Sequence, residues 1–404
     1  MSESRALRTL AVHAGQHPDP EFGALAAPIY QTSTFAYGSF ERGARIFAGD
    51  TPGYVYSRMG NPTVATLERK IAALEQAEDA IAFASGTGAI SALLLALLNP
   101  GDEILFVGPL YGGTEAQLRD LLPRFGIRAL EVGSADALAA AITPRSRMIY
   151  VETPMNPTLG VVDLRQVAEI SRAHGLLSVA DNTFATPILT RPLALGVDIS
   201  LHSATKYIGG HGDATGGIVT GARRQLERIR HVGMKQLGAC MSPQDAYLFI
   251  RGSKTLALRV EQSSANALQL ARFLQQRPEI SCVYYPGLES HPNHAVAARQ
   301  MRGFGGILSC DMAGGLAAAR TLLDNLQLIT QAVSIGDTDS LACHPASTTH
   351  RGIAREIRER QGVTDGMIRF SVGIEDAADL QADLERALNM LGQAPSVVVP
   401  ENRR

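Results

Sequence analysis

The sequence lacks a long hydrophobic run and a strong net charge. Its longest apolar run, AISALLLALL, is too short to cross a bilayer. The formal net charge is -2 over 404 residues. A balance so close to zero gives no electrostatic reason to expect nucleic acid or an anionic membrane surface as a partner. We therefore expect neither kind of partner.

Targeting and metal-binding patterns are also missing from the sequence. The N-terminal residues MSESRALRTLAVHAG have no basic segment followed by an apolar one, which predicts no signal peptide. The cysteines form no CxxC pair, as expected for reduced thiols rather than a disulfide framework or a zinc site. No set of His, Cys and carboxylate residues has the spacing of metal ligands, so we expect no metal. These features favour a cytoplasmic protein.

The order of apolar runs and helical patterns predicts an α/β fold in three parts. Residues 1–60 have weak periodicity and read as an extended N-terminal arm that contacts a neighbouring subunit. From 61 to 255, helices alternate with apolar runs, as in a mainly parallel sheet covered on both faces. Residues 256–398 mix strands and helices, as in a smaller α+β domain. The first confident helix begins at Asn61-Pro62, a helical pattern runs from 242 to 276, and the last residues read as a loose tail.

Three polar features lie where apolar runs end, which is where open α/β sheets bind ligands. The turn SGTG, from Ser85 to Gly88, opens a helix, and helix N-termini with glycine suit phosphate groups. Asp181 ends the run LLSVAD, and Lys206 follows GVDISLHSAT. Each feature has a plainer alternative: a common helix-initiating turn, a helix cap and a surface lysine.

Taken together, the three features match the groups of pyridoxal 5′-phosphate (PLP). A desolvated lysine is nucleophilic and forms a Schiff base with an aldehyde, which is the role predicted for Lys206. An acidic partner on the ring nitrogen is the role predicted for Asp181. The phosphate then belongs at SGTG, with the hydroxyls of Ser203 and Thr205 in local reach.

Seven ordered motifs resemble those of the Cys/Met-metabolism family of PLP-dependent enzymes: YSRMGNPT, SGTGAI, VETPMNPT, VADNTFATP, HSATKYIGGHGD, HPASTTH and RFSVGIED. This family of trans-sulfuration enzymes includes cystathionine γ-synthase, cystathionine γ-lyase, methionine γ-lyase and the O-acylhomoserine sulfhydrylases. The resemblance covers nearly the whole chain. It implies the fold of the aspartate-aminotransferase type (fold type I), PLP as cofactor, a sulfur amino acid as substrate, and a homotetramer built from two dimers with shared active sites.

The resemblance also implies a role for each matched residue. Lys206 matches the Schiff-base lysine, Asp181 the partner of the ring nitrogen, and Tyr111 the residue that stacks over the ring and protonates the leaving group. The other matched positions are the phosphate contacts Gly86, Thr87, Ser203 and Thr205; the pair Tyr56 and Arg58, which reaches the phosphate of the neighbouring subunit; Arg369, which holds the substrate carboxylate; and Ser334, Thr349 and Asn156 of the substrate pocket.

Within the family, residues 233–259 and 334–350 are most similar to the methionine γ-lyases, which implies γ-elimination from methionine or homocysteine. Where cystathionine-processing members carry a glutamate, this chain has Asp337 and Asp339 nearby. Gly113 stands where methionine γ-lyases usually have cysteine and where cystathionine enzymes and sulfhydrylases have glycine. A sulfhydrylase, a cystathionine γ-lyase or γ-synthase, and a plain aminotransferase remain alternatives. A non-catalytic sensor would need a DNA-binding domain, and none is visible.

Overall fold

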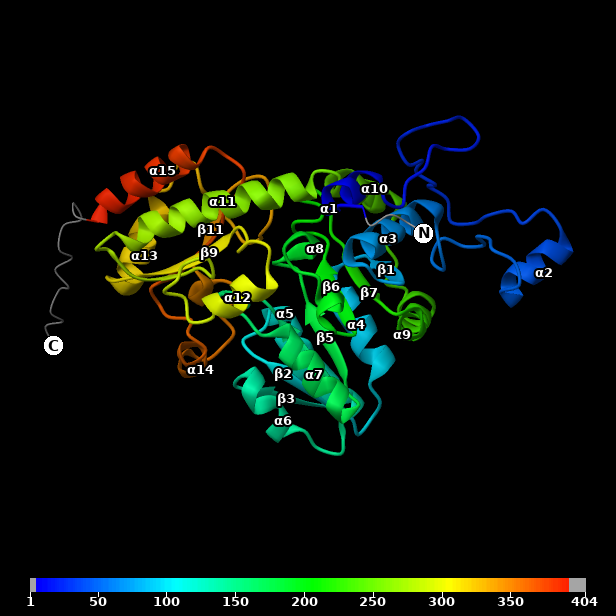
Figure 1. Ribbon diagram of the computed structural model, residues 1–404, viewed down its shortest axis with the longest axis horizontal. Helices are drawn as coiled ribbons and strands as arrows, with labels where there is room; N and C mark the ends of the chain where they lie inside the picture. Colours follow the sequence, from blue (N-terminus) through cyan, green and yellow to red (C-terminus); the bar gives the residue numbers. More distant parts are fainter. Residues whose placement is uncertain (1–4, 392–404) are drawn as a thin grey trace, which may run out of the picture.

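The large sheet is the centre of the molecule in the computed structural model, which describes residues 5–391 (Figure 1). Its strands, in the order β1-β7-β6-β5-β4-β2-β3, are β1 Asp79–Phe83, β7 Gly217–Gly221, β6 Ile199–Ser203, β5 Leu177–Asp181, β4 Ser146–Glu152, β2 Glu103–Val107 and β3 Arg128–Val132. Strand β7 runs antiparallel to both β1 and β6, and the other neighbours are parallel. The prediction of a mainly parallel sheet is confirmed.

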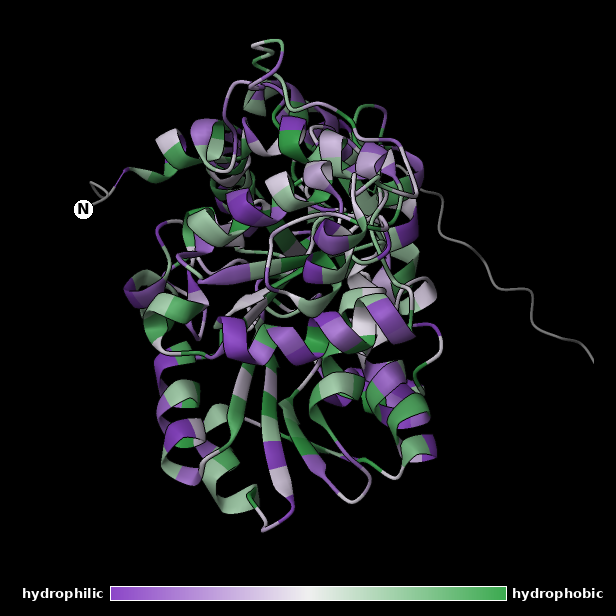
Figure 2. Cartoon of the chain, turned by 90° about the vertical axis from the view of Figure 1, so that its right-hand side faces the viewer, coloured by the Kyte–Doolittle hydropathy of each residue, from purple (hydrophilic) through white to green (hydrophobic). Residues whose placement is uncertain are grey.

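Helices cover both faces of this sheet. Alternate residues of a strand point to opposite faces, so in β1 Ala80 and Ala82 join one apolar cluster while Ile81 and Phe83 join another. The large sheet's strands are mostly green, hydrophobic, in Figure 2, and the helices beside them carry purple as well as green residues. The helices that belong to this part are α3 Pro62–Glu75, α4 Gly86–Leu97, α5 Gly112–Ala116, α6 Leu138–Ala141, α7 Leu164–His174, α8 Thr186–Leu189, α9 Arg223–Arg230 and α10 Pro243–Ser253.

Local capping explains where two important helices begin. The side chain of Asn61 accepts a hydrogen bond from the N–H of Thr63, and Pro62 occupies the first helical position of α3. The side chain of Ser85 accepts from the N–H of Gly88 at the start of α4. Both starts were predicted, and the start of α4 lines the site described below.

A smaller sheet forms the second layered unit. Its strands, in the order β10-β11-β12-β9-β8, are β10 Thr330–Gln331, β11 Leu341–Cys343, β12 Met367–Ser371, β9 Ile307–Met312 and β8 Ile280–Tyr284. The helices of this part are α11 Leu256–Gln275, α12 His294–Gln300, α13 Gly315–Asp324, α14 Arg355–Arg360 and α15 Ala377–Asn389. The mixture of strands and helices predicted after residue 255 is therefore present; the exact domain boundaries remain a prediction.

The helical pattern predicted from 242 to 276 is interrupted, so a continuous helix there is wrong. Helix α10 ends at Ser253 and α11 begins at Leu256. The guanidinium of Arg259 lies at this break, where it donates to the carbonyl oxygen of Gly252 (2.8 Å) and to that of Tyr207 (2.8 Å). The Arg259 side chain therefore provides a donor for a carbonyl oxygen at the end of α10 and links this helix to the segment that follows Lys206.

The N-terminal arm is not wholly extended, which corrects the prediction for residues 1–60. It contains α1 Leu7–His13 and α2 Phe40–Ala48. Helix α1 packs on α3, where the ammonium of Lys70 donates to the carbonyl oxygen of Ala11 (2.6 Å). Helix α2 lies at the end of an arm that projects away from both sheets (Figure 1). Contacts distant in sequence thus stabilise the first helix.

In residues 5–391, no helix combines the length and the hydrophobicity needed to span a bilayer. The four cysteines, Cys240, Cys282, Cys310 and Cys343, are free. The predicted C-terminal tail falls outside the described residues.

Candidate active site

A cavity of about 370 Å³ lies at the carboxyl ends of β4, β5 and β6, beside the N-terminus of α4. This is the edge of a parallel sheet at which ligands bind. The predicted site residues that line it are Gly86, Thr87, Tyr111, Asn156, Asp181, Ser203, Thr205, Lys206, Ser334, Thr349 and Arg369. Segments more than 280 residues apart in the chain therefore meet in one place.

The N-terminus of α4 forms the polar end of the cavity. The first backbone N–H groups of a helix have no acceptor within the helix, and here Gly86 and Thr87 line the cavity. A Cβ atom added to Gly86 would lie only 2.9 Å from the Cβ of Ser203, so glycine is needed for the close approach of α4 to β6. Backbone donors, the helix dipole and the Ser203 hydroxyl together suit a phosphate.

Lys206 follows β6 and enters the cavity from the sheet side. Its ammonium donates a hydrogen bond to Ser334 Oγ over 2.9 Å. Burial lowers the pKa of Lys206, and the nearby charge of Arg369 lowers it further, while Asp337 opposes the shift. A lysine with a lowered pKa supplies more of the neutral, nucleophilic amine at neutral pH.

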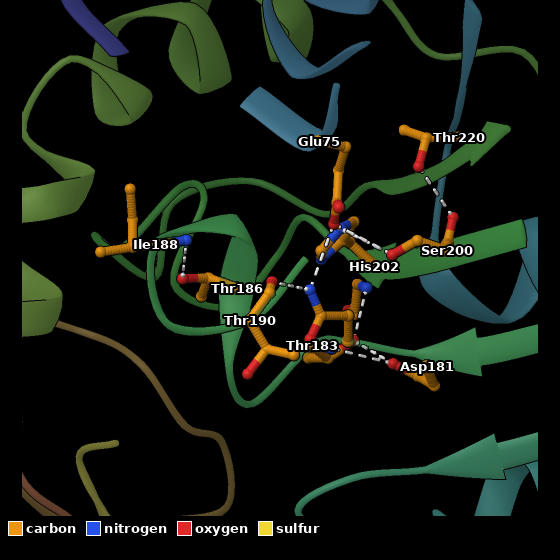
Figure 3. A network of polar contacts seen from close by, with 11 residues as sticks. Glu75, Asp181, Thr183, Thr186, Ile188, Thr190, Ser200, His202 and Thr220 are labelled. Atoms are coloured by element: carbon orange, nitrogen blue, oxygen red, sulfur yellow. Dashed lines mark hydrogen bonds and ion pairs between the residues drawn. The ribbon is translucent and has the colours of Figure 1, made fainter. Parts of the chain in front are cut away.

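Asp181 ends β5 and is held by two donors from one residue. Its Oδ1 accepts from the backbone N–H of Thr183 (3.1 Å) and from the Thr183 hydroxyl (2.5 Å), as Figure 3 shows. Its Oδ2 accepts from the hydroxyl of Tyr150 over 3.3 Å. Burial raises the pKa of Asp181, and the Thr183 hydrogen bonds and the charge of His202 oppose that rise.

Glu152 is a second buried carboxylate in the cavity wall, and the residue-based predictions missed it. It ends β4 directly beside Asp181 in the parallel register. Its Oε2 accepts from the backbone N–H of Tyr111 over 2.7 Å. Burial raises the pKa of Glu152 well above its usual range, and the charge of Asp181 adds to the rise. An acidic residue ending an apolar run, the signal that identified Asp181, also marks Glu152.

Arg369 is buried in β12 rather than exposed on a strand surface. One of its terminal nitrogens donates to Asn156 Oδ1 (2.9 Å) and the other to the carbonyl oxygen of Ser334 (3.0 Å). Its Nε is buried and has no hydrogen-bond partner among residues 5–391. The guanidinium therefore retains donor capacity for a carboxylate entering the cavity.

Tyr111 stands at the open side of the cavity, with 47% of the residue exposed. A Cβ atom built on Gly113 would lie 2.5 Å from Tyr111 Cε1. The tyrosine ring thus occupies the space that a side chain at position 113 would fill. Gly113 sets where the ring can lie.

Tyr56 and Arg58 do not line this cavity. They border a separate hollow, where the Arg58 guanidinium lies 5.5 Å from the centre of the Tyr56 ring and donates to the carbonyl oxygen of Lys235 (3.3 Å). Within one chain the structure therefore does not bring this pair to Lys206. Their predicted role across a subunit interface stays a prediction.

The residues present fit PLP. The α4 N-terminus and the Ser203 and Thr205 hydroxyls suit its phosphate, and the depressed pKa of Lys206 suits a bond to its aldehyde. Asp181 Oδ1 accepts two hydrogen bonds from Thr183, whereas Oδ2 accepts only a long one from Tyr150 (3.3 Å) and keeps a lone pair for a ring nitrogen. The unpartnered Nε of Arg369 suits the carboxylate of an amino-acid substrate.

Comparison with known proteins agrees with this geometry. The model of the family described as "Cys/Met metabolism PLP-dependent enzyme" matches residues 8–389. The L-methionine gamma-lyase of Pseudomonas putida is 48% identical over 383 residues, 94% of this chain and 96% of that protein. The cystathionine gamma-lyase of Bacillus subtilis (strain 168) is 43% identical over 383 residues, 94% of this chain and 98% of that protein. The crystal structure of metB from Corynebacterium glutamicum has a TM-score of 0.91 and 41% identity, covering 96% of this chain and 98% of that chain.

Proposed function

The chain belongs to the Cys/Met metabolism family of PLP-dependent enzymes, and on this basis we propose that it eliminates the γ-substituent of methionine or homocysteine. With methionine, one water is consumed and the products are 2-oxobutanoate, ammonia and methanethiol. PLP and a sulfur amino acid follow from the family; the choice of this substrate is our proposal.

The residues of the cavity suit the individual steps. When bound, PLP withdraws electrons from the substrate carbon next to the amino group. Lys206, displaced by the substrate amine, takes the proton from that carbon and passes it on. The neutral amine then takes a second proton, from the neighbouring carbon. Asp181 holds the proton on the ring nitrogen, and Arg369 orients the substrate carboxylate. The Tyr111 hydroxyl donates a proton to the departing sulfur.

The composition of the cavity wall is the observation that supports methionine. Among the described residues that line it, the carboxylates are Asp181 and Glu152, and both are already engaged with neighbours. Asp337 and Asp339 are not among the lining residues. A distal ammonium, as in cystathionine, has no carboxylate of its own there, whereas a thioether methyl group needs only apolar contact, which Phe184, Val333 and Ile335 offer.

Gly113 supports a second candidate, an enzyme that handles cystathionine or replaces the γ-substituent with a thiol. The absence of a side chain lets the Tyr111 ring lie against position 113, in space that a cysteine side chain would need. This feature is shared with the cystathionine and sulfhydrylase members of the family.

Product analysis distinguishes the two candidates. The purified holoenzyme is incubated separately with methionine, with cystathionine, and with O-acetylhomoserine plus sulfide, and 2-oxobutanoate, methanethiol and homocysteine are quantified. We expect 2-oxobutanoate to form faster from methionine or homocysteine than from cystathionine. A clear preference for cystathionine, or homocysteine as the main product, would assign the protein to the second candidate.

Replacing Tyr111 by phenylalanine is expected to lower kcat about 100-fold, the contribution typical of one general acid. Phenylalanine keeps the ring and the backbone N–H that Glu152 accepts, so only the proton donor is lost. Exchange of the substrate α-proton in deuterated water, followed by NMR, serves as the internal control because it precedes departure of sulfur. Equal losses in exchange and in elimination would indicate that Tyr111 positions the substrate instead.

Mixing two inactive variants tests the proposed assembly, a tetramer of two dimers with shared sites. Arg58→Ala and Lys206→Ala each lack one component, and a mixed dimer has one complete site if Arg58 acts across the interface. Random reassortment of subunits should then restore about a quarter of the wild-type activity. Each variant mixed with itself is the control. A mixture that stays inactive after demonstrated subunit exchange places Arg58 in its own chain's site.

A further inference from the structure

A buried polar cluster lies behind the strand ends that carry the cofactor residues (Figure 3). Its centre is Glu75, the last residue of α3, which is 0% exposed. One oxygen, Oε1, accepts three hydrogen bonds: from Asn182 Nδ2 (3.1 Å), from the Ser200 hydroxyl (3.0 Å) and from His202 Nε2 (2.6 Å). A single carboxylate oxygen thus joins a helix, the end of β5 and the strand β6.

The groups bound by Glu75 neighbour the cofactor residues in the chain. Asn182 directly follows Asp181, and His202 directly precedes Ser203. On the cavity side, the N–H of Ser203 donates to the hydroxyl oxygen of Thr183 (2.8 Å), and that hydroxyl donates to Asp181. Thr183 therefore links Asp181 and Ser203 on the cavity side. On the other side, their chain neighbours Asn182 and His202 both bind Glu75.

The chemistry of the three contacts requires an acceptor at Glu75. The Asn182 amide nitrogen is a hydrogen-bond donor only. His202 Nε2 lies 2.6 Å from Glu75 Oε1, the distance of a strong, charge-assisted hydrogen bond. This contact is an ion pair only when the His202 imidazole is protonated, and it is a hydrogen bond otherwise. A buried carboxylate needs such donors. Removing it would leave Ser200 and His202 with only their long mutual contact (3.5 Å), while Asn182 would keep its bond to the carbonyl oxygen of Thr190 (2.9 Å).

We propose that Glu75 is a positioning residue for the cofactor: it sets the separation and orientation of Asp181 and Ser203 through Asn182, Ser200 and His202. Glu75 is not among the described residues that line the cavity, so it would act through its three partners and not by direct contact with the cofactor. The proposal rests on the family's cofactor and not on the choice of substrate, so it stands whichever sulfur amino acid is used.

The variant Glu75→Gln tests this with little change of shape. Oε2 accepts no hydrogen bond within residues 5–391, so an amide nitrogen in its place loses none. The remaining neutral oxygen binds its three donors more weakly than a carboxylate oxygen does. We expect the dissociation constant for PLP, measured by reconstituting the apoprotein, to rise about tenfold. We also expect the pH midpoint of the visible absorption of the bound cofactor to move.

Thr220→Val is the matched control. Thr220 is buried in the same layer on β7 and donates to the carbonyl oxygen of Ser200, without contacting Glu75. We expect its PLP affinity and absorption midpoint to equal those of the wild type. The proposal is supported if the PLP dissociation constant or the pH midpoint of the absorption changes in Glu75→Gln and neither changes in Thr220→Val.

A purely structural role predicts the opposite pattern. Glu75→Gln would then melt at a lower temperature while its PLP affinity and absorption midpoint stay at wild-type values, and this result overturns the proposal. If Glu75→Gln does not fold, Ser200→Ala is used instead because it removes one of the three donors. Its PLP dissociation constant and the pH midpoint of its absorption are then measured. Wild-type values of both in folded Ser200→Ala overturn the proposal as well.

Discussion

Lys206→Ala should lower turnover by about 10⁴-fold or more, because we propose that this residue both binds the cofactor and moves protons. The chain contains three other lysines, Lys70, Lys235 and Lys254, and none of them lines the cavity. Lys70 is buried against the carbonyl oxygen of Ala11, so it cannot take the place of Lys206. The loss should therefore be close to complete.

Borohydride reduction followed by mass spectrometry is the direct measurement. In the wild type, reduction should fix PLP on the peptide that contains Lys206, and in Lys206→Ala no lysine should be labelled. Lys254→Ala, a lysine substitution outside the cavity, is the control and should keep both labelling and activity. A labelled lysine in Lys206→Ala would show that the assignment of this residue is wrong.

Asp181→Asn should lower kcat by roughly 10²- to 10³-fold, the usual effect of removing one group that stabilises charge in the reaction. The asparagine oxygen can still accept both hydrogen bonds from Thr183, so the side chain keeps its place. Its amide nitrogen then replaces Oδ2, carries no negative charge and no longer accepts the long hydrogen bond from Tyr150. Cofactor should stay bound, but nothing would hold a proton on the ring nitrogen.

The rate of α-proton exchange measured by NMR separates the chemical effect of Asp181→Asn from loss of cofactor, which absorbance quantifies. The control is Asp198→Asn, the same chemical change on an aspartate that accepts from Ser178 outside the cavity (2.6 Å). We expect near-wild-type exchange in Asp198→Asn and strongly reduced exchange in Asp181→Asn. An Asp181→Asn enzyme with full cofactor and wild-type exchange would contradict the role assigned to the carboxylate.

The positions of Asp181 and Lys206 in the cavity could be predicted because strand ends are visible in a sequence. An apolar run that stops at Asp181 or before Lys206 already places these side chains at one edge of a parallel sheet. The turn at Ser85 was predictable for the same reason, since its capping pattern is local. For these residues, neighbours in the chain determine the position.

Other features depend on contacts between distant segments and were not predictable. Helix α1 is fixed by Lys70, 59 residues away, and the break before α11 is fixed by a side-chain contact with Gly252. Glu75 lies at the end of a helix, where a charged residue usually faces solvent, and only the folded chain reveals its three partners. Nothing in the local pattern distinguishes such a residue from an exposed one.

The projecting arm affects how the protein behaves at different concentrations. Phe40 and Phe47 of α2 are 85% and 68% exposed, and Phe22 and Leu25 earlier in the arm are also open to solvent. A second chain that covers these side chains would bind the folded state and not the unfolded one, so dilution would lower the melting temperature. We therefore expect the melting temperature of this protein to rise with its concentration, and a melting temperature that does not depend on concentration would show that no second chain covers the arm.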